Sequence, residues 1–261
     1  MSPLAIPDDY SLAELCICAA AEAWRPDGEV LATGIGLIPR LAASLAKLTT
    51  NPDLLMNDGE AFLVQEPVPV GERPPGYQPQ IEGWLPYRRV FDLLWAGRRH
   101  AMVGPTQIDR FGQTNISFIG DPKKPKVQLL GCRGFPGNTI SHANSCFVPD
   151  HNLRSFVPEV DMVSGVGYDA SRFARGVRRD FIDLRLVVSN LAVLDFQGPE
   201  HAMRLVSVHP GVKPDEVQEQ TGFELARAQQ ICETPAPTDE QLRLIRDVLD
   251  PHGERDGVFR S

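Results

Sequence analysis

The spacing of apolar residues near the start of the chain predicts a helix. Residues 12–24 read LAELCICAAAEAW and follow Ser11, with Glu14 three positions after that serine. A serine followed at this distance by glutamate is the pattern of a capping box, in which each side chain bonds the other's backbone N–H. We therefore expect a helix that begins after Ser11 and buries one face.

Alternation between strand-like and helical patterns continues to about residue 58. Residues 27–36 predict a turn, a strand and a glycine-rich exit, and residues 37–49 have helical apolar spacing with a proline in the first turn, where it is tolerated. Residues 53–58 predict the next strand. A strand–helix–strand unit over 27–58 indicates a parallel sheet.

The rest of the chain predicts short strands, three helices and one long loop. Residues 65–80 are rich in proline, which excludes a central strand or a helix interior and predicts a loop. Strands are expected within 100–104, 115–120, 126–131, 145–149, 160–167, 184–196 and 202–211, and helices at 86–96, 213–222 and 238–249. We predict one α/β domain over 1–261, with a mostly parallel sheet, an antiparallel edge and a polar tail that frays from about residue 250.

Composition excludes several classes of protein. The chain has 261 residues, of which 42% are hydrophobic, and a net charge of −8 without a basic stripe, so nucleic-acid binding is not expected. It has no apolar run long enough to span a membrane, and its first residues lack the pattern of a signal peptide. Five scattered cysteines favour reduced thiols and a cytoplasmic location. Cys16 and Cys18 lack a second Cys/His pair at zinc-ligand spacing, so no metal site is predicted.

Three stretches carry candidate chemistry. Gly34 and Gly36 lack the third glycine of a dinucleotide fingerprint and instead indicate backbone amides exposed at a helix start. Residues 104–117, which include Gln107 and Asn115, form either a polar site or a tight turn held by its own side chains. Residues 129–141 expose backbone N–H groups for an oxyanion or phosphate, or else form a flexible loop without a ligand.

The residues 57–60, Asn-Asp-Gly-Glu, end an apolar run abruptly. Such a position suits a catalytic nucleophile, but the same residues also suit a turn. His142, close to the glycine-rich stretch, is a further candidate for acid/base chemistry, although a buried or solvated structural role is an alternative for it.

Taken in order, these stretches resemble the β subunit of class I coenzyme A transferases. The matching segments are DGEVLATGIGLIPRLAA, LLMNDG, GPTQIDRFGQTN, LLGCRGFPGN, LRLVVSNLAVLDF and HPGVKPDEVQEQTGFEL, within roughly residues 10–230. The resemblance implies a Rossmann-like three-layer α/β/α fold, shared with sugar-phosphate isomerases. It also implies a partner α subunit and an active site at the junction of the two subunits.

The chain departs from this family at two positions. Transferases carry Glu-(Asn/Ser)-Gly after the apolar run, and alignment on Gly59 puts Asn57 at the place of the glutamate that forms the glutamyl-CoA adduct. An amide cannot form that adduct, Asp58 faces the opposite side of a strand, and Glu60 lies past the glycine. The usual Gly-x-Gly-Gly run is replaced by Gly131-Cys132-Arg133-Gly134, in which the added cation favours a carboxylated acyl chain.

Both departures resemble those of a divergent branch, the β subunits of actinobacterial cholesterol ring-cleaving hydrolases. The resemblance implies that water opens a carboxylated ring of a CoA thioester late in steroid ring C/D degradation, without transfer of CoA. It further implies an α2β2 heterotetramer, a catalytic carboxylate on the α subunit, and no cofactor besides the CoA of the substrate.

The candidate site residues follow from this resemblance. Asn57 and Asp58 are the catalytic candidates, and the substrate-binding candidates are Gln107, Gly131, Arg133, Gly134 and Asn138. Two alternatives stay open. The chain is either part of a true CoA transferase acting on a dicarboxylic acyl-CoA, with Asp58 or Glu60 as nucleophile, or a non-catalytic structural subunit.

Overall fold

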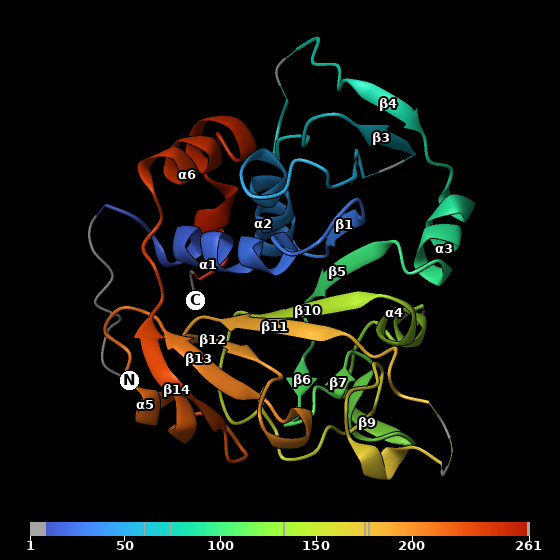
Figure 1. Cartoon of the computed structure of the whole chain (residues 1–261), viewed down its shortest axis with the longest axis vertical. Helices are drawn as coiled ribbons and strands as arrows, with labels where there is room; N and C mark the ends of the chain where they lie inside the picture. The colour runs from blue at the N-terminus through green and yellow to red at the C-terminus, as the bar shows by residue number, and fades with distance from the viewer. Residues whose placement is uncertain are drawn as a thin grey trace. The chain divides into compact units, whose positions relative to one another are not determined.

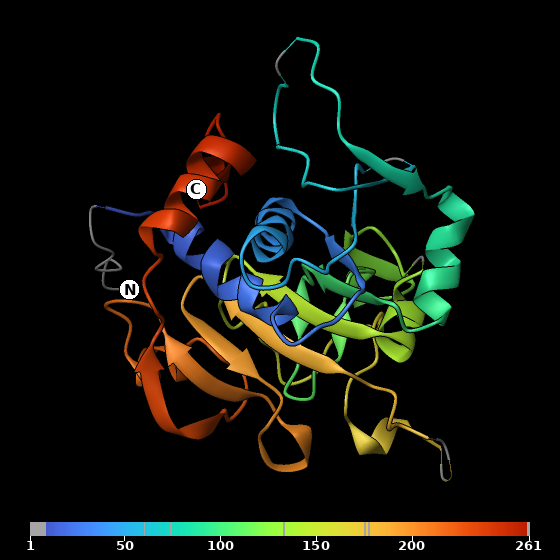
Figure 2. The ribbon, with the colours of Figure 1, turned by 45° about the horizontal axis from the view of Figure 1, so that its top comes forward.

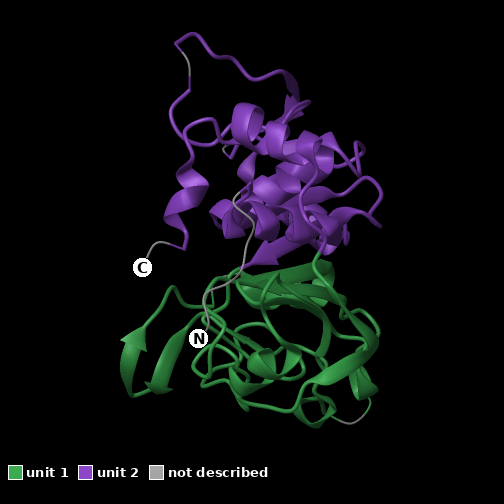
Figure 3. Cartoon of the chain, turned by 90° about the vertical axis from the view of Figure 1, so that its left-hand side faces the viewer, with its two compact units in different colours: residues 1–5, 104–234 green, residues 6–103, 235–261 purple. Residues whose placement is uncertain are grey.

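The computed structural model describes residues 9–59, 61–73, 75–132, 134–174, 176 and 178–259. These residues fall into two compact units, coloured separately in Figure 3. Unit 1 holds the described part of residues 104–234, and unit 2 holds residues 9–103 together with 235–259. The single domain expected over 1–261 stays a prediction.

Unit 2 begins with the helix that the capping box predicts. The Ser11 hydroxyl accepts a hydrogen bond from the Glu14 N–H at 3.2 Å, and the Glu14 carboxylate accepts one from the Ser11 N–H at 2.9 Å. The elements that follow are α1 (Leu12–Ala21), η1 (Glu22–Trp24), β1 (Leu31–Gly34), α2 (Leu37–Leu48) and β5 (Arg99–Val103). Strands β1 and β5 pair in parallel, as the sequence predicts.

The strand expected over 53–58 is shorter than predicted. Leu55 makes one parallel bridge to Leu31, and β2 (Met56–Asn57) then pairs with β3 (Phe62–Val64) in an antiparallel hairpin. A third strand, β4 (Ile81–Trp84), completes this small sheet. The chain leaves the parallel ladder here because the turn at 57–59 reverses its direction.

Residues 65–80 form a long connection in unit 2. Their described part has no helix or strand, in agreement with their proline content, and Figure 2 shows it as an open loop. It leads through β4 into α3 (Tyr87–Trp95), close to the helix predicted at 86–96. No helix in the described part of the chain combines the length and apolar character needed to cross a bilayer.

The C-terminal residues are packed, and the expectation that they fray from about residue 250 is wrong. After α6 (Asp239–Arg243) and η4 (Leu244–Leu249), a further turn η5 (Glu254–Gly257) places Arg255 in the interior. Arg255 donates to the carboxylates of Glu14 at 3.1 Å and Asp250 at 2.9 Å. Asp250 and Arg255 are buried as an ion pair, whereas His252, Glu254 and Asp256 are exposed, so the polar composition alone does not imply that the segment frays.

Unit 1 is built on a mixed sheet (Figure 1). Its strands lie in the order β10 (Ala143–Val148), β11 (Leu184–Ser189), β12 (Ala192–Asp195), β13 (Arg204–Val208) and β14 (Ala226–Glu233). The pairs β10–β11 and β13–β14 are parallel, whereas β11–β12 and β12–β13 are antiparallel. Strands are present within 184–196 and 202–211 as expected, but the first stretch holds two, β11 and β12, which form a hairpin, and β13 of the second stretch pairs antiparallel with β12.

Smaller elements surround this sheet. Two short ribbons pair β6 (Gln107–Ile108) with β7 (Thr114–Asn115) and β8 (Phe118–Asp121) with β9 (Lys124–Gln128). The helical pieces are α4 (Phe135–Ser141), η2 (Ala170–Arg172), η3 (Pro199–His201) and α5 (Pro214–Glu219). The two ribbons position the polar residues of the 104–117 stretch.

Three features of unit 1 differ from the prediction. Residues 160–167 form no strand, and their pairing is limited to one isolated antiparallel bridge between Gly165 and Thr114. Helix α4 occupies part of the glycine-rich stretch expected to be a loop. Strand β14 was not expected, because its mostly polar and exposed side chains lack a strong apolar signal.

Candidate functional site

A cavity of about 160 Å³ lies in unit 2 where β1 ends and α2 and the β2–β3 turn come together. Its wall includes Thr33 and Gly34 of β1, Arg40 and Ser44 of α2, and Asn57 and Gly59 of the turn. The lining combines polar side chains with the apolar ones of Ala32, Ala43, Met56 and Val68, and its described residues include one cation, Arg40, and no carboxylate. The wall includes Asn57, the predicted catalytic residue that the resemblance puts at the place of a family glutamate.

Gly34 allows β1 and α2 to meet at this cavity. A Cβ at Gly34 would lie 2.2 Å from the carbonyl carbon of Pro39 and 2.3 Å from the nitrogen of Arg40. Only glycine fits so close to another backbone. Gly34, which the sequence suggested as exposing backbone amides at a helix start, thus allows close packing, and this packing brings Arg40 to the wall of the cavity.

Asn57 is held in a defined orientation. Its Oδ1 accepts a hydrogen bond from the Gly59 N–H at 3.1 Å, and Gly59 has a φ of 89°, which favours glycine. Since the backbone N–H requires an oxygen acceptor, the amide NH2 must occupy the other position. No described group accepts from Nδ2, so this NH2 is available to a ligand or a water molecule in the cavity.

Asp58 braces the same turn. Its Oδ1 accepts hydrogen bonds from the N–H groups of Ala61 at 3.0 Å and Phe62 at 3.1 Å, while its own N–H donates to the Phe62 carbonyl at 3.1 Å. The 57–59 stretch is therefore a turn held by its own side chains. Asp58 does not line the cavity, its catalytic role stays a prediction, and Glu60 lies outside the described residues.

Arg40 is the cation of the cavity wall and is half-buried. Its guanidinium donates to the Val68 carbonyl at 3.3 Å, and no described carboxylate lies within ion-pair distance. Burial lowers the pKa of Arg40, and the positive charge of Arg73 lowers it further. Sequence reasoning missed Arg40, because an arginine on a helix usually extends into solvent.

The predicted glycine residues belong to unit 1. The Gly131 N–H donates to the Ile116 carbonyl at 3.1 Å, so it is already engaged. Gly134 precedes α4 as its N-terminal cap residue, and a side chain would meet nothing within 4 Å at either glycine. Backbone approach is thus open at both positions. Arg133 lies outside the described residues.

Gln107 has a structural environment. Its Oε1 accepts from Asn115 Nδ2 at 2.7 Å and from the Asp161 N–H at 3.1 Å, and its Nε2 donates to the Asp161 carboxylate at 3.1 Å. Asp109 accepts from the N–H groups of Phe111 and Gln113, and burial raises its pKa to about 6. These contacts favour the tight-turn interpretation of 104–117, and substrate binding by Gln107 stays a prediction.

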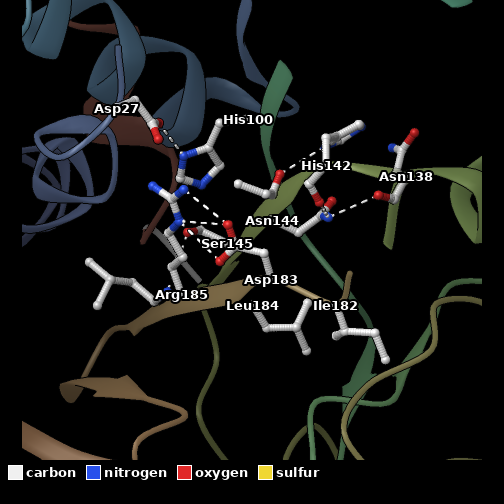
Figure 4. A network of polar contacts seen from close by, with 12 residues as sticks. Asp27, His100, Asn138, His142, Asn144, Ser145, Ile182, Asp183, Leu184 and Arg185 are labelled. Atoms are coloured by element: carbon white, nitrogen blue, oxygen red, sulfur yellow. Dashed lines mark hydrogen bonds and ion pairs between the residues drawn. The ribbon is translucent and has the colours of Figure 1, made fainter. Parts of the chain in front are cut away.

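Asn138 and His142 are both buried in unit 1. The Asn138 carbonyl accepts a hydrogen bond from Asn144 Nδ2 at 3.1 Å, and His142 Nδ1 lies 2.8 Å from the Ala143 carbonyl oxygen (Figure 4). These contacts place the two residues in a backbone-supporting network. Substrate binding by Asn138 stays a prediction.

Figure 4 also labels a buried pair in unit 2 that was not predicted. His100 Nδ1 lies 2.7 Å from the Asp27 carboxylate, and both side chains are almost fully shielded from solvent. Asp27 and His100 are distant in sequence, so their spacing carries no signal. The pair links the residues before β1 to β5.

Unit 1 has an open cavity of about 940 Å³ that sequence reasoning also missed. Its wall includes Asp109, Phe111 and Arg172. Arg172 forms ion pairs with Glu159 at 2.7 Å and Asp169 at 3.4 Å, so its charge is compensated. Arg40 in the smaller cavity of unit 2 has no described carboxylate partner, and this uncompensated charge distinguishes the two cavities.

No family model matches the chain. It is 47% identical over 248 residues to the cholesterol ring-cleaving hydrolase IpdB subunit of Rhodococcus jostii, covering 95% of this chain and 96% of that protein. It is also 31% identical over 268 residues to one subunit of the 3-oxoadipate CoA-transferase of Pseudomonas knackmussii, covering 95% of this chain and 98% of that protein.

Solved structures give the same pattern. The crystal structure of Rhodococcus jostii IpdAB matches with a TM-score of 0.89 and 44% identity over 97% of this chain and all of that chain. The crystal structure of glutaconate coenzyme A-transferase from Acidaminococcus fermentans matches with a TM-score of 0.78 and 26% identity, covering 97% and 98%.

Proposed function

Because this chain belongs to the family of cholesterol ring-cleaving hydrolase IpdB subunits, we propose that it is the β subunit of a hydrolase that opens a ring of a steroid-derived CoA thioester. The observation that carries the proposal is 47% identity over nearly the whole length of both chains. The site agrees with the proposal, since Asn57 of β2, which the resemblance puts at the place of the transferase glutamate, lines the unit 2 cavity.

The predicted fold class is confirmed by the structural likenesses. The chain has the three-layer α/β/α fold of the coenzyme A transferases, with a mixed, mostly parallel sheet. The IpdAB structure also supports an α subunit as partner. An α2β2 stoichiometry is part of the proposal, as is a cytoplasmic location, which five free cysteines support.

The proposed reaction consumes one water per ring. Water adds to a ring carbonyl, the adjacent C–C bond breaks, and the departing carbon takes the electron pair as an enolate, which then accepts a proton. The thioester stays intact, and CoA is part of the substrate, so no further cofactor is required. The general base is expected on the α subunit.

Asn57 is proposed to hold the attacking water or a substrate carbonyl. Its Oδ1 is occupied by the Gly59 N–H, which leaves the Nδ2 protons as donors toward an oxygen in the cavity. A donor that is already oriented loses little freedom when the oxygen arrives, which is how fixed hydrogen bonds lower a barrier. Backbone N–H groups near Gly134 and the cation of Arg133 remain predictions for the oxyanion and the substrate carboxylate.

The test uses the chain co-purified with its α subunit and a carboxylated cyclic acyl-CoA thioester in water labelled with ¹⁸O. We expect a ring-opened product that still carries CoA and contains one ¹⁸O in its new carboxylate. Asn57→Ala should lower kcat about 100-fold, by loss of an oriented donor, with assembly unchanged. Asn51 is unsuitable as a control because it is buried, so the exposed amide of β14 serves, in the variant Gln229→Ala.

Two outcomes would contradict the proposal. Free CoA or its transfer to an added acid, with a hydroxylamine-sensitive adduct on Asp58 or Glu60, would indicate a transferase. Unchanged turnover in Asn57→Ala and Arg133→Ala complexes would indicate that this subunit serves only as a scaffold for the α subunit.

A further inference from the structure

We propose that Arg40 binds a free carboxylate of the acyl group, next to Asn57 in the unit 2 cavity, and so selects substrates that carry one. The inference rests on the proposed function, because it assumes an acyl-CoA thioester as substrate. It assigns to α2 a specificity-determining residue that the sequence did not indicate.

Arg40 has no described ion-pair partner, unlike Arg246 and Arg255 of the same unit. Arg255 is paired with Glu14 and Asp250, and Arg246 is paired with Glu14. Arg40 has one described contact, to the Val68 carbonyl. A guanidinium carries five N–H donors in a planar fork that matches a carboxylate, so most of its donors remain for a ligand.

The surroundings of Arg40 favour an anion. The cavity wall supplies neutral polar groups from Thr33, Ser44 and Asn57, and no described acidic residue lines it. Arg73 adds a second positive charge whose influence reaches Arg40. A half-buried cation without a counter-charge is costly, and an incoming carboxylate would remove that cost.

The size and place of the cavity favour an acyl carboxylate over a phosphate of CoA. About 160 Å³ is smaller than typical drug-sized sites and suits one end of an acyl group. The cavity contains Asn57, at the position where related transferases carry the acyl-accepting glutamate. The phosphates of CoA lie beyond the whole pantetheine arm from the thioester.

The named substrates of relatives agree with this assignment. Matching proteins are a 3-oxoadipate CoA-transferase and a glutaconate CoA-transferase, and both names denote dicarboxylic acids. A thioester formed at one carboxyl group leaves the other free. A cation close to the reacting end is what such a substrate class requires.

The experiment measures binding and turnover by the co-purified complex with two probes. One is a carboxylated cyclic acyl-CoA thioester, and the other is the same thioester with its carboxylate replaced by a carboxamide. Arg40→Gln should weaken binding of the carboxylate probe about 10-fold or more and leave binding of the carboxamide probe unchanged. Arg40→Lys should fall between wild type and Arg40→Gln, because it keeps the charge without the fork.

Matched variants separate this role from others. Arg88→Gln, at an exposed arginine of α3, should change neither affinity. Equal losses for both probes in Arg40→Gln would assign Arg40 a structural role and overturn the proposal. Weakened binding of free CoA would assign it to a phosphate, and a carboxylate-specific loss confined to Arg133→Gln would assign the carboxylate to Arg133. If Arg40→Gln fails to assemble, the same comparison is made with Arg40→Lys.

Failure of this inference is distinguishable from failure of the proposed function. Calorimetric binding of the two probes does not require ring opening, so it tests Arg40 even in a complex that transfers CoA. Conversely, ring opening with ¹⁸O incorporation supports the hydrolase whichever residue holds the carboxylate.

Discussion

At the residue scale, three adjacent residues have separate tasks. Asn57 presents its amide to a cavity, Asp58 binds two backbone N–H groups of the hairpin, and Gly59 adopts a positive φ. The polar residues that look like a cluster of nucleophiles are therefore mainly a turn. Asn57 lines the cavity and Asp58 does not, and the amide of Asn57 cannot form an acyl adduct.

The role of Asp58 can be tested by stability. Asp58→Ala removes an acceptor of two backbone hydrogen bonds and should destabilise the chain by about 2 kcal/mol, since bonds to a charged group exceed neutral ones. The apparent midpoint of thermal unfolding of the co-purified complex measures this. Asp53→Ala, at an exposed aspartate, is the control. Equal unfolding midpoints for the two variants would show that Asp58 does not stabilise the turn.

At the element scale, close backbone approach and buried charge decide how unit 2 is assembled. Gly34 lets the end of β1 contact the first turns of α2, which positions Arg40. Glu14, in the first turn of α1, accepts hydrogen bonds from Arg246 and Arg255 of the C-terminal segment. The capping residue of the first helix is thus also the anchor of the last elements.

Removing the charge of Glu14 should loosen the C-terminal segment. Glu14→Gln leaves Arg255 buried with one partner fewer and should cost about 3 kcal/mol. Hydrogen exchange over residues 239–257 should accelerate more than exchange in α2. Glu240→Gln breaks an exposed pair with Arg243 and should cost between about 0 and 1 kcal/mol. Unchanged exchange in Glu14→Gln would disprove the anchor.

The same anchor predicts a dependence on pH. Burial raises the pKa of Glu14, but the hydrogen bonds from Arg246 and the Ser11 N–H, with the charge of Arg255, outweigh it and hold the pKa below 4.5. The unfolded chain therefore takes up the proton first as the pH falls. The stabilisation is complete above about pH 4.5 and is lost as the pH falls through the lower folded pKa. The difference in the free energy of unfolding between wild type and Glu14→Gln should therefore shrink as the pH falls through this range.

At the scale of the whole molecule, exposed aromatic residues indicate a missing partner. In unit 2, Trp84, Tyr87 and Trp95 are 69%, 75% and 73% exposed, although such residues are usually covered. Together they give β4 and α3 an apolar surface. Such a surface agrees with the partner subunit that the IpdAB structure supports.

The chain without its α subunit should therefore aggregate or express poorly. Size-exclusion chromatography of the lone chain and of the co-expressed pair tests this, and the pair should elute as one discrete species. A lone Trp84→Ser/Trp95→Ser variant should aggregate less than the lone wild type. A monodisperse lone wild-type monomer would argue against the need for a partner.

Many of the helices and strands could be predicted because their formation depends mainly on the pattern of residues close in sequence. The capping box at Ser11 and the helix α2 (Leu37–Leu48) depend on residues close in sequence. The missed elements depend on distant neighbours. Residues 160–167 pair only through a bridge from Gly165 to Thr114, a distant segment, and no pattern within the stretch reveals this contact.

What the sequence determined by itself is most of the helices and strands, the family, and the prediction that the amide of Asn57 stands in place of a carboxylate. Only the tertiary structure decided that Asp58 braces a turn, that Gln107 is occupied by Asn115 and Asp161, and that Arg40 lacks a described counter-charge. The physical reason is that residue type and spacing set local conformation, whereas burial and pairing of polar groups depend on which distant segments pack together.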